Sequence, residues 1–302
     1  MATEPTNLDA LVTEARGAAT SDYDLQTTRE LVEGMNREDA AVPIVVGGAA
    51  GEIAAAIDAV VERLARGGRL VYVGAGSSGR IAALDAAECE STFSTEPGQV
   101  VALLAGADLA SPLEQEAAED DAEAGERELA ALRVGEADAV VGISASGRTP
   151  YVLGAIRAAA EAGALTACVV SVPGSELAAL VEHEIAVVVG PEFVAGSTRL
   201  KAGTAQKLVL NTISTVSMIR LGKTFGDLMV DVNATNEKLR ERVRRTVRLA
   251  TGAGDGEADD ALAAAGGSAK VAIVSLLAGI DAAAARERLA EAGGSIRLAV
   301  GR

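Results

Sequence analysis

The sequence predicts an α/β protein with an open parallel sheet, helices on both faces of that sheet, and a small helical C-terminal subdomain. Short runs of Val, Leu and Ile alternate with segments of helical periodicity through the first two-thirds of the chain. Two of these runs pass directly into turns rich in serine and glycine. Later segments are rich in alanine and separated by glycines. We therefore expect an N-terminal arm over residues 1–45, the α/β domain over 46–235 and the helical subdomain over 236–302.

Apolar spacing and glycine stops define the elements in order. The arm is polar, has one predicted helix near residues 29–35, and is expected to pack on the rest of the chain or on a second subunit. Apolar residues at helical spacing predict a helix over residues 49–66, which Gly67 and Gly68 end. Buried strands are predicted over residues 69–73, 100–104, 137–143, 165–172 and 185–189. Further helices are predicted over residues 80–88, 113–132, 151–162 and 201–221.

Composition excludes several classes of partner. The chain has 302 residues, 49% of them hydrophobic, which is enough to bury a sizeable core. Its net charge of -16 and aromatic content of 2% argue against nucleic acid as a partner. Residues 238–245 form one basic run, but the interleaved Glu241 is typical of a solvated helix face. The acidic excess, with more Arg than Lys, would also fit a salt-rich cytoplasm.

Cysteine usage and the apolar runs indicate the compartment. Cys89 and Cys168 are isolated, so they form neither a disulfide framework nor a metal-binding pattern. The first residues lack the basic and apolar regions of a signal peptide. Glycine or charge interrupts every long apolar stretch before it could span a bilayer. We expect a cytoplasmic protein with no membrane partner and no metal site.

Two Ser/Gly loops are the strongest functional signal. Residues 74–80 read Gly-Ala-Gly-Ser-Ser-Gly-Arg, residues 144–149 read Ser-Ala-Ser-Gly-Arg-Thr, and each loop lies between a predicted strand and a predicted helix. Such turns present backbone N–H groups beside the positive end of a helix dipole, and serine hydroxyls add donors with little bulk. Ligands of open α/β sheets bind beyond the carboxyl ends of the strands. Two such loops are therefore expected to converge on one anion, such as the phosphate of a sugar phosphate.

Other interpretations of the first loop fit less well. Its Gly-x-Gly-x-x-Gly spacing also occurs in dinucleotide sites, but no acidic residue closes the second strand at residues 100–104. The second loop has no role in a dinucleotide site. A P-loop is excluded because no Gly-Lys-Ser/Thr follows. Two tight turns without a ligand remain a less favoured alternative, because both turns are rich in serine.

The paired loops resemble the sugar isomerase (SIS) fold of phosphosugar isomerases and phosphosugar-responsive regulators. Further segments resemble the N-acetylmuramic acid 6-phosphate etherase family, in order, over nearly the whole chain. These segments are residues 85–89, 118–120, 146–151, 196–207 and 233–239. The runs at residues 201–207 and 233–239 are long and specific. One departure is visible: Glu90-Ser91-Thr92 stands where the family usually has Pro-Pro-Thr, which puts the shape of that loop in doubt.

The resemblance implies an activity. The family cleaves the lactyl ether of its sugar phosphate with water, and it needs neither a metal nor a redox cofactor. An ether at C3 beside an acidic C2 proton can be cleaved by elimination, which requires one base and one acid. By the family pattern, Glu88 is the acid that protonates lactate and later activates water, and Glu119 is the base at C2. The apolar residues around Glu88 in the sequence would raise its pKa. The ordinary alternatives are that Glu88 is an acid at the end of a helix and that Glu119 lies on a solvated acidic face.

The same resemblance assigns the phosphate site. The implied ligands are Ser78, Ser144, Ser146 and Thr149, with Ser77 and Gly79 nearby. Lys201 and Lys207 could add charge to the site or form salt bridges within the long helix, and Arg148 and Arg199 have the same two alternatives. His183, the sole histidine, is interpreted as an exposed or satisfied residue without a catalytic role.

Two further functions share this fold. A non-catalytic phosphosugar sensor would keep both loops and lack the paired glutamates, and no basic helix-turn-helix domain precedes the predicted sheet. An aldose–ketose isomerase commonly uses a histidine for ring opening, and His183 is poorly placed for that role. The lyase is therefore favoured. Because the family dimerises, we also expect a homodimer.

Overall fold

The computed structural model describes residues 13–17, 22–231 and 237–301. The chain divides into two compact units, which are considered separately. The sheet unit comprises residues 1–86 and 98–213, and the helical unit comprises residues 87–97 and 214–302. Residues 1–12 of the predicted arm, the predicted domain boundary near residue 236 and residues 233–236 of the last family-like segment lie outside the described residues.

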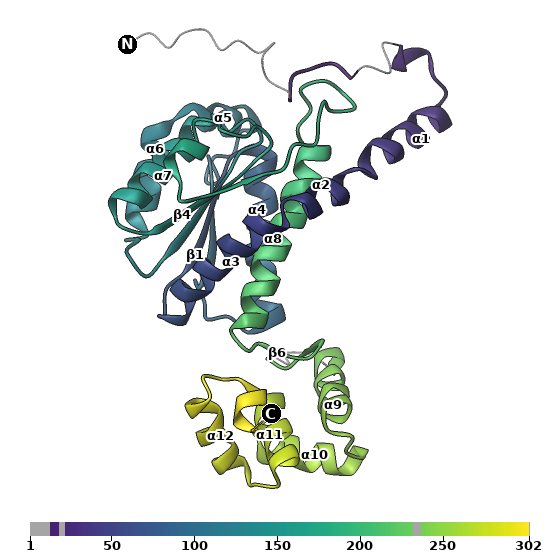
Figure 1. The fold of residues 1–302 in the computed structure, drawn as a ribbon, viewed down its shortest axis with the longest axis vertical. Coiled ribbons are helices and arrows are strands. Elements are labelled where there is room, and N and C mark those ends of the chain that lie inside the picture. The colour runs from purple at the N-terminus through teal and green to yellow at the C-terminus, as the bar shows by residue number, and fades with distance from the viewer. Residues whose placement is uncertain (1–12, 18–21, 232–236, 302) are drawn as a thin grey trace. The chain divides into compact units, whose positions relative to one another are not determined.

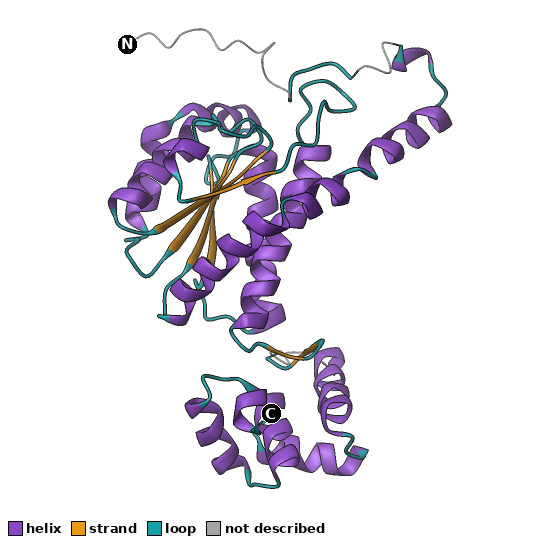
Figure 2. Cartoon of the chain, in the orientation of Figure 1, coloured by secondary structure: helices purple, strands orange, loops and turns teal. Residues whose placement is uncertain are grey.

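The predicted parallel sheet is confirmed (Figure 2). Five parallel strands lie in the order β2-β1-β3-β4-β5. Every residue of β1 and β3 is buried, as the apolar runs predict for a sheet with both faces covered. The strands are β1 Leu70–Gly74, β2 Val100–Leu104, β3 Ala139–Ile143, β4 Leu165–Val170 and β5 His183–Ala186. The last strand begins two residues before the predicted range of 185–189.

Helices cover both faces of the sheet (Figure 1). The helices α6 and α7 lie on one side, where they bury Val71, Val73, Val140 and Cys168. The helix α3 lies on the other side, close to β3, β4 and β5. The helices of this part are α3 Ala50–Ala65, α4 Gly76–Phe93, α5 Pro112–Ala117, α6 Ala122–Ala131, α7 Pro150–Glu161 and α8 Lys201–Arg220.

The prediction of one continuous helix over residues 113–132 is wrong. Residues 113–132 do not form a single helix, because the 3₁₀ turn η3 (Ala118–Asp120) separates α5 from α6. Asp121 then has an extended backbone, and its side chain accepts a hydrogen bond of 2.8 Å from the N–H of Ala124. An aspartate that caps a helix start in this way favours a new helix over continuation of the old one.

The arm contacts the same chain, which is one of the two predicted alternatives. The helix α1 (Thr28–Asp39) confirms the predicted helix near residues 29–35 and starts with a capping box between Thr27 and Glu30. The helix α2 (Val42–Gly48) follows it. The ring of Tyr23 stacks on Phe193, with 4.2 Å between ring centroids, and Glu38 of α1 lies 2.6 Å from the Nζ of Lys201 at the start of α8.

The predicted helical subdomain is confirmed as well. After the hairpin of β6 (Thr224–Phe225) and β7 (Leu228–Met229), helices from the rest of the chain share one core that includes Val247, Ala258 and Ile273. These helices are α9 Glu237–Thr251, α10 Asp255–Ala264, α11 Ala269–Ala278, α12 Ala282–Glu291 and α13 Ile296–Ala299. Among the described residues no single helix is long and apolar enough to cross a bilayer, and only two bent helix pairs meet that criterion by length and composition.

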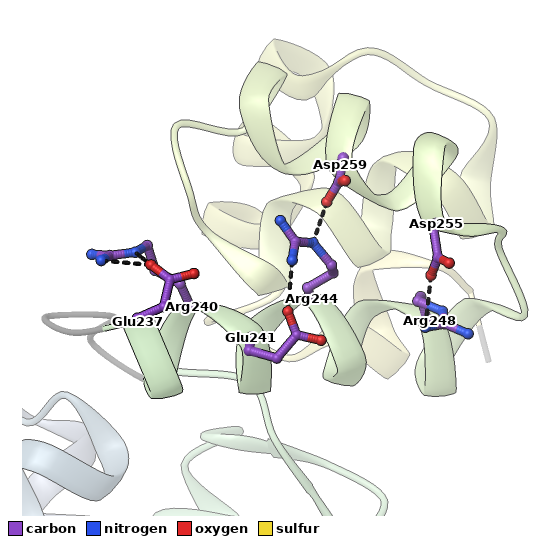
Figure 3. A network of polar contacts seen from close by, with 7 residues as sticks. All are labelled: Glu237, Arg240, Glu241, Arg244, Arg248, Asp255 and Asp259. Atoms are coloured by element: carbon purple, nitrogen blue, oxygen red, sulfur yellow. Dashed lines mark hydrogen bonds and ion pairs between the residues drawn. The ribbon is translucent and has the colours of Figure 1, made fainter.

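The basic run at residues 238–245 forms ion pairs at the surface of the helical unit (Figure 3). Arg244 of α9 pairs with Glu241, at 2.6 Å, and with Asp259 of α10, at 2.5 Å. Arg248 pairs with Asp255 of α10, at 2.6 Å. The pairs with Asp255 and Asp259 link α9 to α10, although exposed ion pairs add little stability because water and salt screen them. The interpretation of the run as a solvated helix face agrees with this arrangement.

An ion pair holds the strand starts of β1 and β3 together. Arg69 donates to Asp138 through Nη2 at 2.8 Å and through its backbone N–H at 2.8 Å, and Gly135 N–H donates to the same carboxylate at 3.0 Å. Burial alone would raise the pKa of Asp138, but the hydrogen bonds from Arg69 and Gly135 hold it below its ordinary value. The ionised carboxylate therefore stabilises the fold.

We predict that Asp138→Asn lowers the free energy of unfolding by about 2 kcal/mol at pH 7, since charged hydrogen bonds are lost in a buried place. Because the folded pKa is lowered, this stabilisation is complete above the pKa of an unfolded aspartate, about 3.9, and disappears as the pH falls through the lower folded value. Urea unfolding between pH 7 and pH 2 measures it. Asp58→Asn, on the exposed face of α3, is the matched control. An undiminished difference below pH 3 would contradict the assignment.

Candidate active site

The two Ser/Gly loops follow neighbouring strands. The chain passes from β1 to β2 on one side and later to β3 on the other, so the order of strands reverses between β1 and β3. Gly74, the last residue of β1, is paired in register with Ile143, the last residue of β3. The two loops therefore start side by side at the carboxyl edge of the sheet. This is the switch point at which open α/β sheets bind ligands.

The first loop is shorter than predicted. The helix α4 begins at Gly76 rather than at residue 80, so Ser77, Ser78 and Gly79 belong to its first turn. A Cβ on Gly79 would lie 2.6 Å from the carbonyl oxygen of Gly74 and 2.4 Å from Cδ1 of Leu104. Glycine is therefore required for the helix start to lie so close to the end of β1. The first N–H groups of a helix have no partner within the helix, and here they lie beside two serine hydroxyls.

The second loop is folded around Ser144. Its buried Oγ accepts a hydrogen bond of 3.0 Å from the N–H of Gly147 and lies 2.8 Å from Oγ1 of Thr149. The Oγ of Ser146 accepts a hydrogen bond of 3.3 Å from the N–H of Arg148. Pro150 then starts α7 with Thr149 as its N-cap residue. The three predicted hydroxyls thus lie in one turn at the start of a helix.

Glu119 lies next to the first loop. The residue belongs to η3, and its Oε2 lies 4.0 Å from the position that a Cβ on Gly76 would take. The pKa of Glu119 is raised above its ordinary value by burial first, and then by the negative charges of Asp120 and Glu116. A carboxyl group with a raised pKa beside a Ser/Gly loop is suited to proton transfer.

Comparison with known proteins identifies the family. The sequence matches the family described as "Glucokinase regulatory protein N-terminal SIS domain" over residues 52–160. It is 59% identical to an N-acetylmuramic acid 6-phosphate etherase of Rubrobacter xylanophilus, over 98% of both chains. It is 53% identical to that of Streptomyces avermitilis, over 97% of this chain and 94% of the relative. The chain belongs to the N-acetylmuramic acid 6-phosphate etherase family.

Solved structures agree with the SIS fold expected for this etherase family. A phosphoheptose isomerase from Francisella tularensis superposes with a TM-score of 0.53 at 20% identity, over 64% of this chain and all of that chain. An Escherichia coli CFT073 protein in complex with A5P superposes with a TM-score of 0.51 at 20% identity, over 69% of this chain and 97% of that chain. At this identity the likeness shows the fold alone.

The departure from the etherase pattern has a structural consequence. Residues 90–92 remain helical, and α4 continues to Phe93. Two prolines at this point would end a helix, because proline lacks the N–H that helix continuation requires. The Oγ of Ser91 donates a hydrogen bond of 3.2 Å to the carbonyl oxygen of Glu88. Glu88 itself is exposed on α4, so the apolar residues beside it in the sequence do not bury it.

The role of Lys201 is clearer than the sequence allowed. Its side chain is only 5% exposed and pairs with Glu38 of α1, not with a residue of its own helix. The buried carboxylate of Glu192 accepts hydrogen bonds of 2.9 Å from the N–H groups of Lys201 and Ala202 and so caps α8. Lys201 therefore attaches the arm to the start of α8. Lys207, Arg148 and Arg199 form no ion pair with a described residue.

Sequence reasoning missed a residue that supports the second loop. Tyr151, in the first turn of α7, is fully buried and donates a hydrogen bond of 2.5 Å to Oε2 of Glu128 on α6. Burial first, and then this hydrogen bond, raise the pKa of Tyr151 far above its ordinary value. The phenol therefore stays neutral and fixes the start of α7. The only available signal was an aromatic residue directly after the loop in a chain with three tyrosines.

We predict that Gly147→Ala abolishes measurable binding of sugar phosphates. Gly147 has a φ of +67°, and a Cβ there would lie 2.1 Å from Oγ of Ser175, so the loop cannot keep its shape. Calorimetric titration with a sugar 6-phosphate measures the effect. Gly51→Ala, at an open position within α3, should bind as the unchanged protein does. Unaltered affinity in Gly147→Ala would exclude the second loop from the site.

Proposed function

We propose that this protein cleaves the D-lactyl ether of N-acetylmuramic acid 6-phosphate with water and releases N-acetylglucosamine 6-phosphate and D-lactate. The observation that carries the proposal is 59% identity over 98% of the chain to an etherase with that substrate in its name. The pair of Ser/Gly loops at the switch point supports it, because the substrate carries a phosphate. The enzyme is then a carbon–oxygen lyase.

In this proposal the two loops hold the phosphate. Ser77, Ser78 and the first turn of α4 donate from one side, and Ser144, Ser146 and Thr149 donate from the other. Hydrogen bonds to an anion are about twice as strong as those between neutral groups. Both helix starts add favourable dipole interactions. The phosphate end of the sugar is thereby fixed, which leaves C2 and C3 to face the catalytic carboxyl groups.

The proposed chemistry is elimination followed by hydration. In the open-chain aldehyde, Glu119 removes the C2 proton, the C3–O bond breaks, and Glu88 gives a proton to the departing lactate oxygen. Glu88 then takes a proton from water as its oxygen adds to C3, and a proton returns to C2. One water is consumed and one alcohol is released, so no electrons are exchanged and no redox cofactor is required. The raised pKa of Glu119 supports its role, because it makes the carboxylate a stronger base.

A non-catalytic sensor of phosphosugars is the alternative function. It would use the same loops but would have no need for an acid and a base. The position of Glu119 beside the first loop favours the lyase over the sensor. We also propose a cytoplasmic location, which fits two buried cysteines that are not joined in a disulfide.

We further propose that the protein is a homodimer. On α4, Glu88 follows Ser78 by ten residues, a rise of about 15 Å along the helix, which is longer than one sugar ring. A second copy could supply Glu88 to the sugar that Ser78 holds. The arm also exposes apolar side chains that a partner would bury, among them Val32 at 54% and Ile44 at 77% exposure.

The first test is incubation of the purified protein with N-acetylmuramic acid 6-phosphate. We predict stoichiometric release of D-lactate and N-acetylglucosamine 6-phosphate, measured by a lactate dehydrogenase assay and mass spectrometry. In H₂¹⁸O the label should enter the sugar at C3 and not the lactate, because the C3–O bond is the one that breaks. Binding of the substrate without lactate release would favour the sensor.

The second test addresses the two carboxyl groups. Glu88→Gln and Glu119→Gln should each lower kcat by about 10²–10⁴-fold while sugar phosphate binding persists, since proton transfer is lost. Glu90→Gln and Glu116→Gln are matched controls on the exposed faces of the same helix and of α5. Because the charge of Glu116 raises the pKa of Glu119, Glu116→Gln should keep activity and shift the ascending limb of the pH profile to lower pH. Full activity of either catalytic variant would remove that residue from the mechanism.

The third test addresses the dimer. Glu88→Gln and the double variant Ser78→Ala, Ser144→Ala should each be inactive alone. If Glu88 acts across a dimer, a refolded mixture should regain up to about a quarter of the unmixed wild-type activity, because half of the chains pair as heterodimers with one intact site. Light scattering should give the mass of two chains. No recovery from a mixture proven to contain heterodimers would place both groups in one subunit.

A further inference from the structure

Two lysines of the helical unit share one carboxylate. Nζ of Lys270 lies 2.6 Å from Oδ2 of Asp231, and Nζ of Lys223 lies 3.2 Å from the same oxygen. Lys223 also donates to the carbonyl oxygen of Ser94, at 3.4 Å. No second carboxylate of a described residue lies within ion-pair distance of either ammonium group. The two positive charges are therefore balanced by a single negative charge.

The position of Lys270 is unfavourable for a cation in three respects. Its side chain is only 11% exposed, and burial disfavours a charged group. It is the second residue of α11, after the N-cap Ser268, where the helix dipole is positive. Lys223 is a second positive charge, held within about 6 Å by the shared oxygen, and like charges repel strongly at that distance. One carboxylate offsets only part of this cost.

The surrounding backbone leaves access to the two lysines. Gly294 has a φ of +81°, and a Cβ there would lie 3.5 Å from Nζ of Lys270, so the glycine leaves that side of the ammonium uncovered. The backbone of Gly222, next to Lys223, packs against Gly294 and Ser295, which brings the two loops together. Lys223 and Asp231 keep 22% and 21% of their side chains exposed, so a small solute can reach them. The lysines are thus held in place yet remain accessible.

We propose that Lys223 and Lys270 form a binding site for a small oxyanion, a phosphate group or a carboxylate, in the helical unit. The anion would lie between the two ammonium groups near the start of α11 and supply the missing negative charge. The site belongs to a different unit from the two Ser/Gly loops and does not depend on the proposed lyase activity. Asp231 holds the lysines together and competes with the anion for their hydrogen bonds.

The test uses the full chain carrying Ser78→Ala and Ser144→Ala, which weaken the loop site. Calorimetric titration of this background with inorganic phosphate at low ionic strength should give one binding event, and a parallel titration with acetate distinguishes phosphate groups from carboxylates. Adding Lys223→Met or Lys270→Met should weaken binding by about tenfold or more, because a charged hydrogen bond is lost. Lys238→Met, in the first turn of α9, is the matched control and should leave the affinity unchanged.

Asp231→Asn separates an anion site from a purely structural ion pair. If the lysines bind an anion, removal of the competing carboxylate should tighten phosphate or acetate binding by about tenfold. If the lysines only balance Asp231, the variant should lose stability with no gain in affinity, which overturns the proposal. Absence of both phosphate and acetate binding to the background, or equal affinities in the Lys223→Met and Lys238→Met variants, also overturns it. Lys223 and Asp231 are partly exposed, so their variants decide the matter if Lys270→Met fails to fold.

Discussion

The in-register pairing of β1 with β3 is the constraint on which the candidate site depends. Because Gly74 and Ile143 are partners, the two loops leave the sheet next to each other, although about seventy residues separate them in sequence. The Arg69–Asp138 ion pair ties the opposite ends of the same two strands. Two parallel strands fixed at one end and followed by glycine-rich turns at the other support the proposed anion site, whose donors would be mostly backbone and hydroxyl groups.

Close packing then determines which residues can form that site. The start of α4 lies so near the end of β1 that Gly79 cannot carry a side chain, and the second loop is so near Ser175 that Gly147 cannot either. Both glycines are therefore needed for geometry rather than for flexibility. Two other interactions also fix the start of a helix. They are the buried Tyr151–Glu128 hydrogen bond, at α7, and the capping of α8 by Glu192. The helix starts are where the chain concentrates its hydrogen-bond donors.

The sequence predicted what local patterns determine. Apolar runs located all five strands to within three residues, and glycine with serine located both loops. Prediction from the sequence failed where a contact with a distant residue, or competition between two local structures, determines the conformation. The break at η3 depends on Asp121 preferring to cap α6, and a run of acidic residues gave no sign of which one would do so. The partner of Lys201 lies on α1, 163 residues away, so helical spacing could not reveal it. Glu88 is exposed despite its apolar sequence neighbours. Ala86 and Cys89 are buried on another side of α4, and Leu84, one turn before Glu88, is itself exposed.

A phosphate bound at the loops would affect the pKa of Glu119, and the two helix starts would counteract that effect. A phosphate at the loops brings negative charge near a carboxylate whose pKa burial already raises, and this charge would raise that pKa further. Too large an increase would leave Glu119 protonated at neutral pH and useless as a base. The positive ends of α4 and α7 would offset the phosphate charge, and because Glu119 lies beside the first residue of α4, the same helix start favours its ionised form. In the proposed reaction the loops therefore do two things: they hold the phosphate, and they keep its charge from over-protonating the base beside it.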